Sequence, residues 1–486
     1  MTRGECGLSG TAEDGEIERL KAKLDRERAK VGKLVAMRDR HSARRIAWLA
    51  ERGALQRRLA VLESQHRLLI AVPGELDSSG SPLRILVWGP VRKTIVEFLG
   101  GAMITGDPEQ GPFDLVVIPR PEKQDLDQVA GGIPEAVWTA VRTGRTRVVL
   151  DGSSEGKLHR TVIGRFRSLA ERTGAPLGQM TYLMQDRLAA RGWGEPGPSI
   201  DVPLPVINYD YYLHKTVFPM LKHGQPVFRR RLAGYRAAPR RGRRAFLSLN
   251  LAPRGHRVVL LSRLLRDGVW DNGFVSFGGF GPAGGDAGDP VGAAPVVDWG
   301  GFETAGEGLA PWVAELHRKG VLLFGVPEGP EPSAVAREVL RAGELREYRR
   351  SWFSVVTETE MRRDTLRVTE KVLKPLLNFH PFVVLGNPGA LRLIQSYGFQ
   401  TFPEIFDESY DDEVDPVRRF DLVYDQVVRM ARMDEAELDR LEASVAEKVV
   451  FNARWGLTRL PHLFQDTLLP AAIAQLLPPE SATAQR

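Results

Sequence analysis

The sequence contains a single cysteine, Cys6, in 486 residues. One cysteine cannot form an internal disulfide, which fits a reducing compartment. The nine histidines show neither an HExxH nor an HxH spacing, so no zinc site of the usual kind can be assembled from these side chains. We therefore expect no metal and no other cofactor.

Long apolar runs are also lacking. No stretch approaches the roughly 20 apolar residues of a membrane-spanning helix, and residues 1–16 have no apolar region of the kind found in secretory signals. We therefore expect a cytoplasmic protein without a transmembrane segment. Glycine loops of the GxGxxG or Walker type are missing, as is a Gly-x-Ser-x-Gly elbow, so NAD-binding, P-loop and hydrolase assignments have no support.

The composition is that of an ordinary globular protein, with 43% hydrophobic and 26% charged residues, and the length corresponds to about three domains. The net charge of +6 suggests a nucleic-acid ligand. However, the basic residues are mostly arginine, in a sequence also rich in Ala, Gly and Pro, a bias that genome composition alone can produce. Residues 229–244 hold eight arginines, which predict a solvated connection between domains or, alternatively, a site for an anionic partner. We do not expect nucleic-acid binding to be the main function.

The N-terminal part differs from the rest of the chain. Residues 1–14 are expected to be disordered, and residues 15–70 are highly charged and nearly free of proline. Apolar residues recur in this second segment at heptad a and d positions, which predicts a coiled coil or helical arm for homo-oligomerisation or for docking to a partner protein. A helix that lies on its own globular domain is the alternative. The turn-rich residues 71–82 are expected to form a linker.

Residues 83–240 are predicted to form a first α/β domain. Short apolar runs at 83–89, 113–119 and 146–152 are typical of buried parallel strands, and the segments between them have helical spacing.

A second α/β domain is predicted over residues 241–475, with a helical C-terminus from about residue 416 and a tail at 476–486. An amphipathic helix is expected over 256–268. The strands are expected at 245–250, 272–279, 321–327, 352–359 and 381–389. Two such units would place a ligand at the carboxyl ends of their strands.

The candidate site lies within residues 353–402. Glu358 falls at the carboxyl end of a predicted strand, and Thr369 is the expected N-cap of a helix whose first turn contains Glu370 and Lys371. A helix N-terminus attracts anions, and a lysine there is favourable if a phosphate binds at the same place. The turn Gly386-Asn387-Pro388 after the next strand is expected to face the same cleft.

These residues resemble the donor-binding region of the fucosyltransferase-like glycosyltransferases (family 10-like), in particular their distant bacterial and phage members. The motifs that carry the resemblance are Thr357-Glu358-Thr359, Thr369-Glu370-Lys371 and Gly386-Asn387-Pro388. The likeness is good over residues 353–402 and looser from 246 to 277 and from 407 to 415. Thr359 stands where the family usually has Asn, and Pro375 is expected to kink the helix.

The resemblance implies a GT-B fold of two Rossmann-like domains and an inverting, metal-independent sugar transfer. It implies that Glu370 binds the ribose and Lys371 a phosphate of a nucleotide-sugar donor, with GDP-fucose or another GDP-sugar favoured. Arg257, or in its place Arg254, would bind the phosphates from a second helix start. Glu358 would be the catalytic base or a carboxylate that orients the donor.

The implied acceptor is a hydroxyl of a glycan, a lipid-linked saccharide or a protein. Two other functions remain open at this point. One is a non-catalytic scaffold that kept the glycosyltransferase fold and assembles through residues 15–70. The other is a coiled-coil nucleic-acid binder, which would require the arginines of 229–244 to be exposed beside the arm.

Overall fold

The structure is a computed structural model that describes residues 70–71, 83–89, 91, 94–100, 102–121, 124–154, 160–188, 205–238, 242–280, 297, 299–324 and 345–477. The predicted disordered terminus and coiled coil lie outside these residues, except for Ile70. Ile70 and Ala71 form a short strand, β1, so the helical arm and the linker do not meet at residue 70 as expected. β1 pairs with a neighbouring strand, and this pairing fixes its extended backbone.

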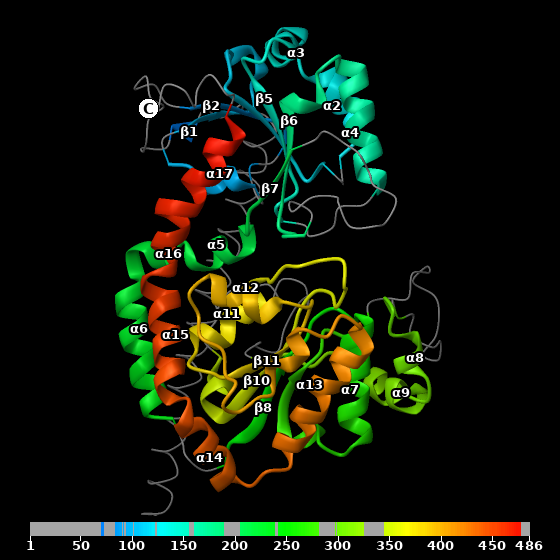
Figure 1. Ribbon diagram of the computed structural model, residues 1–486, viewed down its shortest axis with the longest axis vertical. Coiled ribbons are helices and arrows are strands. Elements are labelled where there is room, and N and C mark those ends of the chain that lie inside the picture. The colour runs from blue at the N-terminus through cyan, green and yellow to red at the C-terminus, as the bar shows by residue number, and fades with distance from the viewer. Residues whose placement is uncertain are drawn as a thin grey trace, which may run out of the picture. The chain divides into compact units, whose positions relative to one another are not determined.

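The first sheet has seven strands in the order β1-β3-β2-β4-β5-β6-β7 (Figure 1). All neighbours are parallel except β1 and β3. The predicted strands are confirmed as β2 (Arg84–Val87), β4 (Leu115–Pro119) and β5 (Arg147–Asp151). Three further strands are present that were not predicted, namely β3 (Met103–Thr105), β6 (Met180–Met184) and β7 (Val206–Asn208).

Helices cover both faces of this sheet, which explains why its central strand β4 is apolar and buried at every position. Val116 and Ile118 of β4 pack in one apolar cluster with α2 (Leu126–Gly132), α3 (Glu135–Arg142) and α4 (Arg160–Thr173). Val117, on the opposite face, packs in a second cluster with the 3-10 helix η1 (Ile95–Phe98) and with α17 (Leu469–Leu476). Alternate residues of a strand point to opposite faces, so both clusters draw on the same strands.

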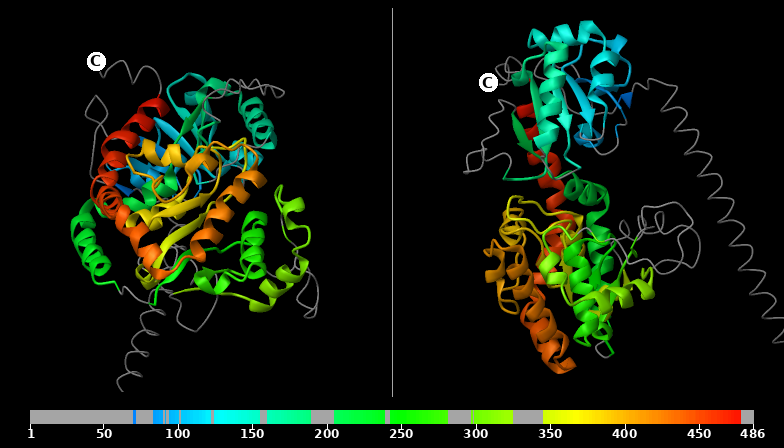
Figure 2. Two further views of the ribbon diagram at one scale, coloured as in Figure 1. Left: turned by 60° about the horizontal axis from the view of Figure 1, so that its bottom comes forward. Right: turned by 90° about the vertical axis from the view of Figure 1, so that its right-hand side faces the viewer.

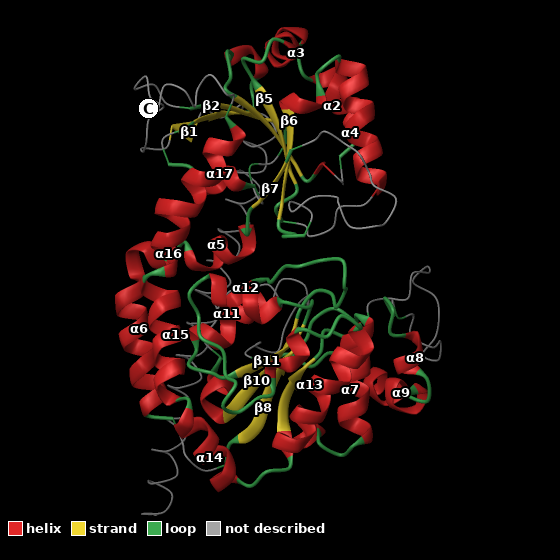
Figure 3. Cartoon of the chain, in the orientation of Figure 1, coloured by secondary structure: helices red, strands yellow, loops and turns green. Residues whose placement is uncertain are grey.

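The second sheet has four parallel strands in the order β11-β10-β8-β9 (Figure 3). These strands confirm four predictions and span Arg244–Leu249 (β8), Gly273–Ser276 (β9), Ser351–Thr357 (β10) and Phe382–Leu385 (β11). The strand predicted at 321–327 is wrong for residues 321–324, where Leu322 forms only an isolated bridge with Phe277. Val321 beside it is 48% exposed, so no buried strand surface forms there.

The largest apolar cluster surrounds the second sheet. It includes residues of α7 (Gly255–Arg266), α9 (Ala310–Lys319), α11 (Glu370–Leu377), α12 (Ala390–Ser396) and α13 (Pro416–Ala431). Further helices are α5 (Tyr211–Val217), α6 (Met220–Arg236), α8 (Glu303–Gly306), α14 (Glu435–Ser444), α15 (Ala446–Thr458) and α16 (Leu460–Leu463). A side chain at Gly224 of α6 would place its Cβ 1.9 Å from the Leu457 carbonyl oxygen, so glycine permits α6 to pack closely on α15.

The last helix returns to the first sheet, where Leu469, Ile473 and Leu476 pack in the same cluster as Ile85 of β2 (Figures 1 and 2). The tail expected from residue 476 therefore begins later, because Leu476 is buried in α17. Among the described residues, none of the helices is both long enough and apolar enough to span a bilayer.

Candidate functional site

A cavity of about 240 Å³ lies beside the second sheet. It extends from the carboxyl ends of β8 and β10, across an apolar part of the sheet, to the start of α11. Its apolar wall includes Leu247, Leu249, Phe324, Tyr348 and Val356, and its polar wall includes Asn250, Arg254, Arg257, Thr359, Glu370, Lys371 and Lys374. Because the strands are parallel, their carboxyl ends and the start of α11 meet at one edge of the sheet.

Thr369 is the N-cap of α11, as the sequence predicts, and its hydroxyl oxygen accepts a hydrogen bond from the Lys371 amide at 3.4 Å. Glu358, directly after β10, binds Thr369 with both carboxylate oxygens: Oε1 accepts from the Thr369 amide at 2.9 Å and Oε2 from its hydroxyl at 2.6 Å. Glu358 is buried, and it does not line the cavity. In this structure the Glu358 carboxylate therefore fixes the start of α11.

Glu370 and Lys371 both reach the cavity from the first turn of α11. The Lys371 ammonium lies 3.3 Å from a Glu370 carboxylate oxygen and donates to the hydroxyls of Thr369 at 3.1 Å and Thr359 at 3.4 Å. Burial acts to raise the pKa of Glu370, but the neighbouring Lys371 and Lys374 outweigh it and hold this pKa below its ordinary value. Glu370 is therefore ionised near neutral pH.

Two arginines enter the cavity from the start of α7. Arg254 is the N-cap residue, and its guanidinium has no hydrogen bond or ion pair within the part of the chain that the structure describes. Arg257 is only 3% exposed and donates to the backbone carbonyls of Thr357 at 3.2 Å and Glu358 at 2.8 Å. Burial lowers its pKa to about 10, which leaves it charged at neutral pH. Its Nε has no partner among the described residues.

Lys374 is a site residue that the sequence analysis missed. It lies on α11 one turn after Lys371, lines the same cavity and is 7% exposed. Within the described residues its ammonium makes neither a hydrogen bond nor an ion pair. Burial lowers the pKa of Lys374 to about 8. The position of Lys374 could have been inferred from sequence, because it lies three residues after Lys371 and residues i and i+3 share a helix face.

Gly386 and Asn387 do not line the cavity. The Gly386 carbonyl accepts a 2.9 Å hydrogen bond from Arg419 Nε, and Asn387 Oδ1 accepts one of the same length from the Arg362 amide. A Cβ at Gly386 would lie 3.3 Å from Glu358 Cγ, so the glycine leaves room for the Glu358 side chain. This turn therefore supports the segment 358–369, which connects β10 to α11, and does not contact the cavity directly.

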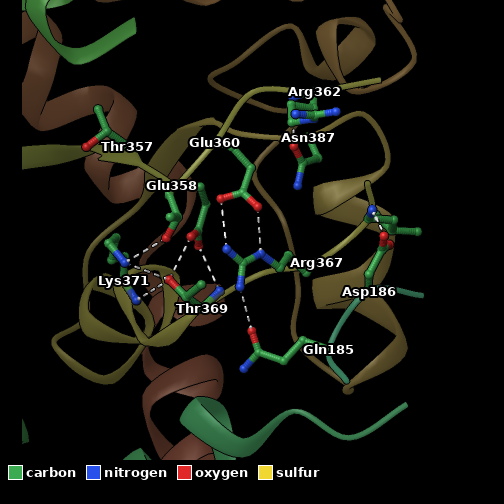
Figure 4. Close-up of polar contacts among 12 residues, drawn as sticks. Gln185, Asp186, Thr357, Glu358, Glu360, Arg362, Arg367, Thr369, Lys371 and Asn387 are labelled. Carbon is green, nitrogen blue, oxygen red and sulfur yellow. Dashed lines mark hydrogen bonds and ion pairs between the residues drawn. The ribbon is translucent and has the colours of Figure 1, made fainter. Parts of the chain in front are cut away.

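A second set of polar residues braces segment 358–369 (Figure 4). Glu360 and Arg367 form a buried two-point ion pair with distances of 3.0 and 2.8 Å, and Arg367 also donates to Gln185 at 3.1 Å. Asp186, next to Gln185 after β6, accepts from the Leu366 amide at 2.8 Å. Burial raises the pKa of Asp186 to about 6. Gln185 and Asp186 were not predicted as site residues, because β6, which positions them, was not predicted.

Fold and site together define an α/β protein with a cation-lined cavity at the carboxyl edge of a parallel sheet. Of the eight predicted site residues, Arg254, Arg257, Glu370 and Lys371 line this cavity, whereas Glu358, Thr369, Gly386 and Asn387 hold the surrounding backbone. Within the described ranges, no group of three or more His, Cys, Asp or Glu side chains could hold a metal ion.

Comparison with known proteins finds no matching family model and no curated protein of similar sequence. Among solved structures, the chain is similar to one described as "Crystal Structure of alpha1,3-Fucosyltransferase". The identity is 10% over 78% of this chain and 93% of that chain, with a TM-score of 0.32. A likeness at this level establishes neither family nor activity.

Proposed function

We propose that the protein is a glycosyltransferase that moves a sugar from a nucleoside-diphosphate sugar to a hydroxyl group. The observation that carries this proposal is the set of four cations, Arg254, Arg257, Lys371 and Lys374, around one cavity in which Glu370 is the only carboxylate among the described residues. Buried cations without an opposite charge are costly, so such a set is favourable when an anion binds among them. The diphosphate of a nucleotide sugar is an anion of this kind.

The other walls of the cavity fit the remaining parts of such a donor. Glu370 offers a carboxylate that can accept hydrogen bonds from ribose hydroxyls. The apolar wall formed by Leu247, Leu249 and Tyr348 provides a surface for the flat face of a nucleobase. The resemblance of the Thr369-Glu370-Lys371 motif to the fucosyltransferase-like family favours a GDP-sugar, with GDP-fucose as the first donor to test.

We further propose an inverting transfer in a GT-B arrangement of two Rossmann-like units, in which protein cations stabilise the leaving diphosphate. Glu358 has a positioning role in this proposal, because its two oxygens hold Thr369 at the start of α11. The acceptor is a hydroxyl of a glycan, a lipid-linked saccharide or a protein.

The test is nucleotide release from a panel of GDP-, UDP- and CMP-sugars, measured on the full chain without an acceptor, since slow donor hydrolysis reports on the donor site alone. Lys371→Ala is compared with the wild type and with a matched control, Lys222→Ala, an exposed lysine of α6. We expect release from one donor, a loss of at least about tenfold in Lys371→Ala, and no change in the control.

Binding of GDP or UDP without release from any donor would overturn the transferase and support the non-catalytic scaffold. Neither binding nor release would overturn the assignment of the cavity as a nucleotide site.

A further inference from the structure

Lys374 is the most deeply buried charge in the cavity that has no partner among the described residues, since Arg254 is likewise unpaired but only half-buried. Lys371 shares its charge with Glu370 and with two hydroxyl groups, and Arg257 donates to backbone carbonyls. Lys374 has no comparable partner among the described residues, although it is 93% buried and lines the cavity. An ammonium group in such a position costs stability, so its presence beside the cavity points to a ligand atom that binds it.

The charges of the cavity can be compared with those of a diphosphate. Among the described residues, four cations and one carboxylate line it, which gives them a net charge of three positive when all are ionised. A nucleotide sugar carries two negative charges, because both phosphates are esterified. The nucleoside diphosphate that departs carries about three, because its terminal phosphate gains a second ionisable oxygen with a pKa near 6. The net charge of the cavity therefore balances the charge of the leaving nucleoside diphosphate better than that of the intact donor.

We propose that Lys374 binds the terminal phosphate of the departing nucleoside diphosphate, where it supplies the charge that is needed only as the sugar–phosphate bond breaks. In that step the anomeric carbon forms a bond with the acceptor oxygen, and the bonding electron pair stays on the phosphate oxygen. The proton of the acceptor hydroxyl passes to water. This role rests on the proposed function and adds to it a residue that favours the product-like state over the bound donor.

The surroundings of Lys374 are compatible with this role. Glu370 on its own helix and Glu358 at the end of β10 favour the charged form, whereas Lys371 disfavours it. Arg254 and Arg257 of α7 lie in the same cavity and add positive charge.

Two more helices, α5 and α15, pack on α11, and none of their charged groups shifts the pKa of Lys374. Tyr348 of the 3-10 helix η6 (Arg346–Arg350) also lines the cavity, and burial raises the pKa of its hydroxyl above the ordinary value. Tyr348 is therefore neutral, and an anion bound beside Lys374 meets no negative charge from it.

The experiment is a calorimetric titration of the full chain with inorganic pyrophosphate and, separately, with inorganic phosphate. The variants are Lys374→Met, which keeps the shape and removes the charge, Lys374→Arg, which keeps the charge, and the exposed control Lys222→Met. Near neutral pH we expect Lys374→Met to weaken pyrophosphate binding about tenfold and to affect phosphate much less, since a second phosphate adds a charge-assisted contact. Lys374→Arg and the control should bind within a factor of about three of the wild type.

A pH series separates the role of Lys374 from general charge effects. As the pH rises above about 8, Lys374 loses its proton and wild-type affinity should fall relative to Lys374→Arg, which stays charged. Ionisation of pyrophosphate itself affects both proteins equally.

Equal pyrophosphate affinities of Lys374→Met and wild type, or no pyrophosphate binding by the wild type, would overturn the proposal. If nucleotide is released from a donor in the sugar panel but Lys374→Met binds pyrophosphate as tightly as the wild type, only the role proposed for Lys374 is overturned. If pyrophosphate binding depends on Lys374 but no donor releases nucleotide, the proposed transferase activity is overturned and the cavity remains assigned as a diphosphate-binding site.

Discussion

At the scale of single residues, burial of positive charge defines the site. Arg257 and Lys374 are both more than nine-tenths buried, and burial lowers the pKa of each. Neither forms a salt bridge within the described part of the chain. Such residues reduce the stability of the empty protein and favour the binding of an anion.

Lys374→Met should therefore stabilise the protein while it weakens binding. The folded-state pKa of Lys374 is about 8 against 10.5 in the unfolded chain, so between these values the unfolded state binds more protons. The free energy of unfolding of the wild type should rise with pH in this window. Near neutral pH we expect the variant to gain about 1–3 kcal/mol. Urea denaturation at neutral and alkaline pH measures both effects, and a variant less stable than the wild type would contradict the account.

Glu358→Gln distinguishes positioning from base catalysis. Because Gln can still accept from the Thr369 amide, we expect donor release to fall by no more than about tenfold, with an unchanged pH profile. If Glu358 were the general base, its loss would lower the rate of donor release by about 10²–10⁴-fold and remove the acidic limb of the pH–rate profile. Thr369→Val should give a larger loss, because it also removes the hydroxyl that accepts from the amide and the ammonium of Lys371, and adding Glu358→Gln to it should have little further effect.

At the scale of elements, segment 358–369 between β10 and α11 determines where Lys371 and Lys374 lie. The buried ion pair of Glu360 and Arg367 holds this segment, with both side chains less than a tenth exposed. Removing only the guanidinium takes both ion-pair hydrogen bonds from a buried carboxylate, which is the costly situation for a buried pair.

We accordingly expect Arg367→Met to lower the free energy of unfolding by about 3 kcal/mol, and Glu360→Gln combined with Arg367→Met to recover part of this loss. The free energies of unfolding of the wild type, the two single variants and the double variant, measured with denaturant, form a double-mutant cycle that gives the interaction energy of the pair. Additive losses would show that the two side chains do not act as a pair.

The elements that carry the site were largely predictable from sequence. The apolar runs of β8, β10 and β11 and the N-cap Thr369 follow local rules of strand and capping preference. β3 and β7 have only three residues each, too few to show a pattern of their own. The lining of the cavity could be predicted only in part, because it requires α7, α11 and the sheet to converge in three dimensions. Lys374 was missed for that reason.

At the scale of the whole molecule, the return of the C-terminal helix to the first sheet is the least predictable feature. α17 follows helices that pack around the second sheet, yet its apolar residues join the cluster of β2 and η1. Nothing in the local sequence of 469–476 specifies which sheet it covers, because any apolar face satisfies its pattern.

Deleting residues 469–486 should therefore destabilise the first sheet. Leu469, Ile473 and Leu476 are buried, and burial of each such side chain contributes about 1.5–3 kcal/mol, so we expect a loss of more than about 4 kcal/mol. Deletion of 478–486 alone, which leaves α17 intact, is the matched control. Thermal unfolding measures the difference, and equal midpoints for the two deletions would contradict the packing of α17 on this sheet.

The most direct test of the central claim is a crystal structure of the full chain with GDP. The account predicts that the two phosphates lie in the cation-lined cavity, with phosphate oxygens about 3 Å from the ammonium of Lys371 and from an arginine at the start of α7, Arg254 or Arg257. The base would lie along the apolar wall of Leu247 and Leu249. GDP bound elsewhere on the molecule, with the cavity unchanged, would contradict the assignment of this site.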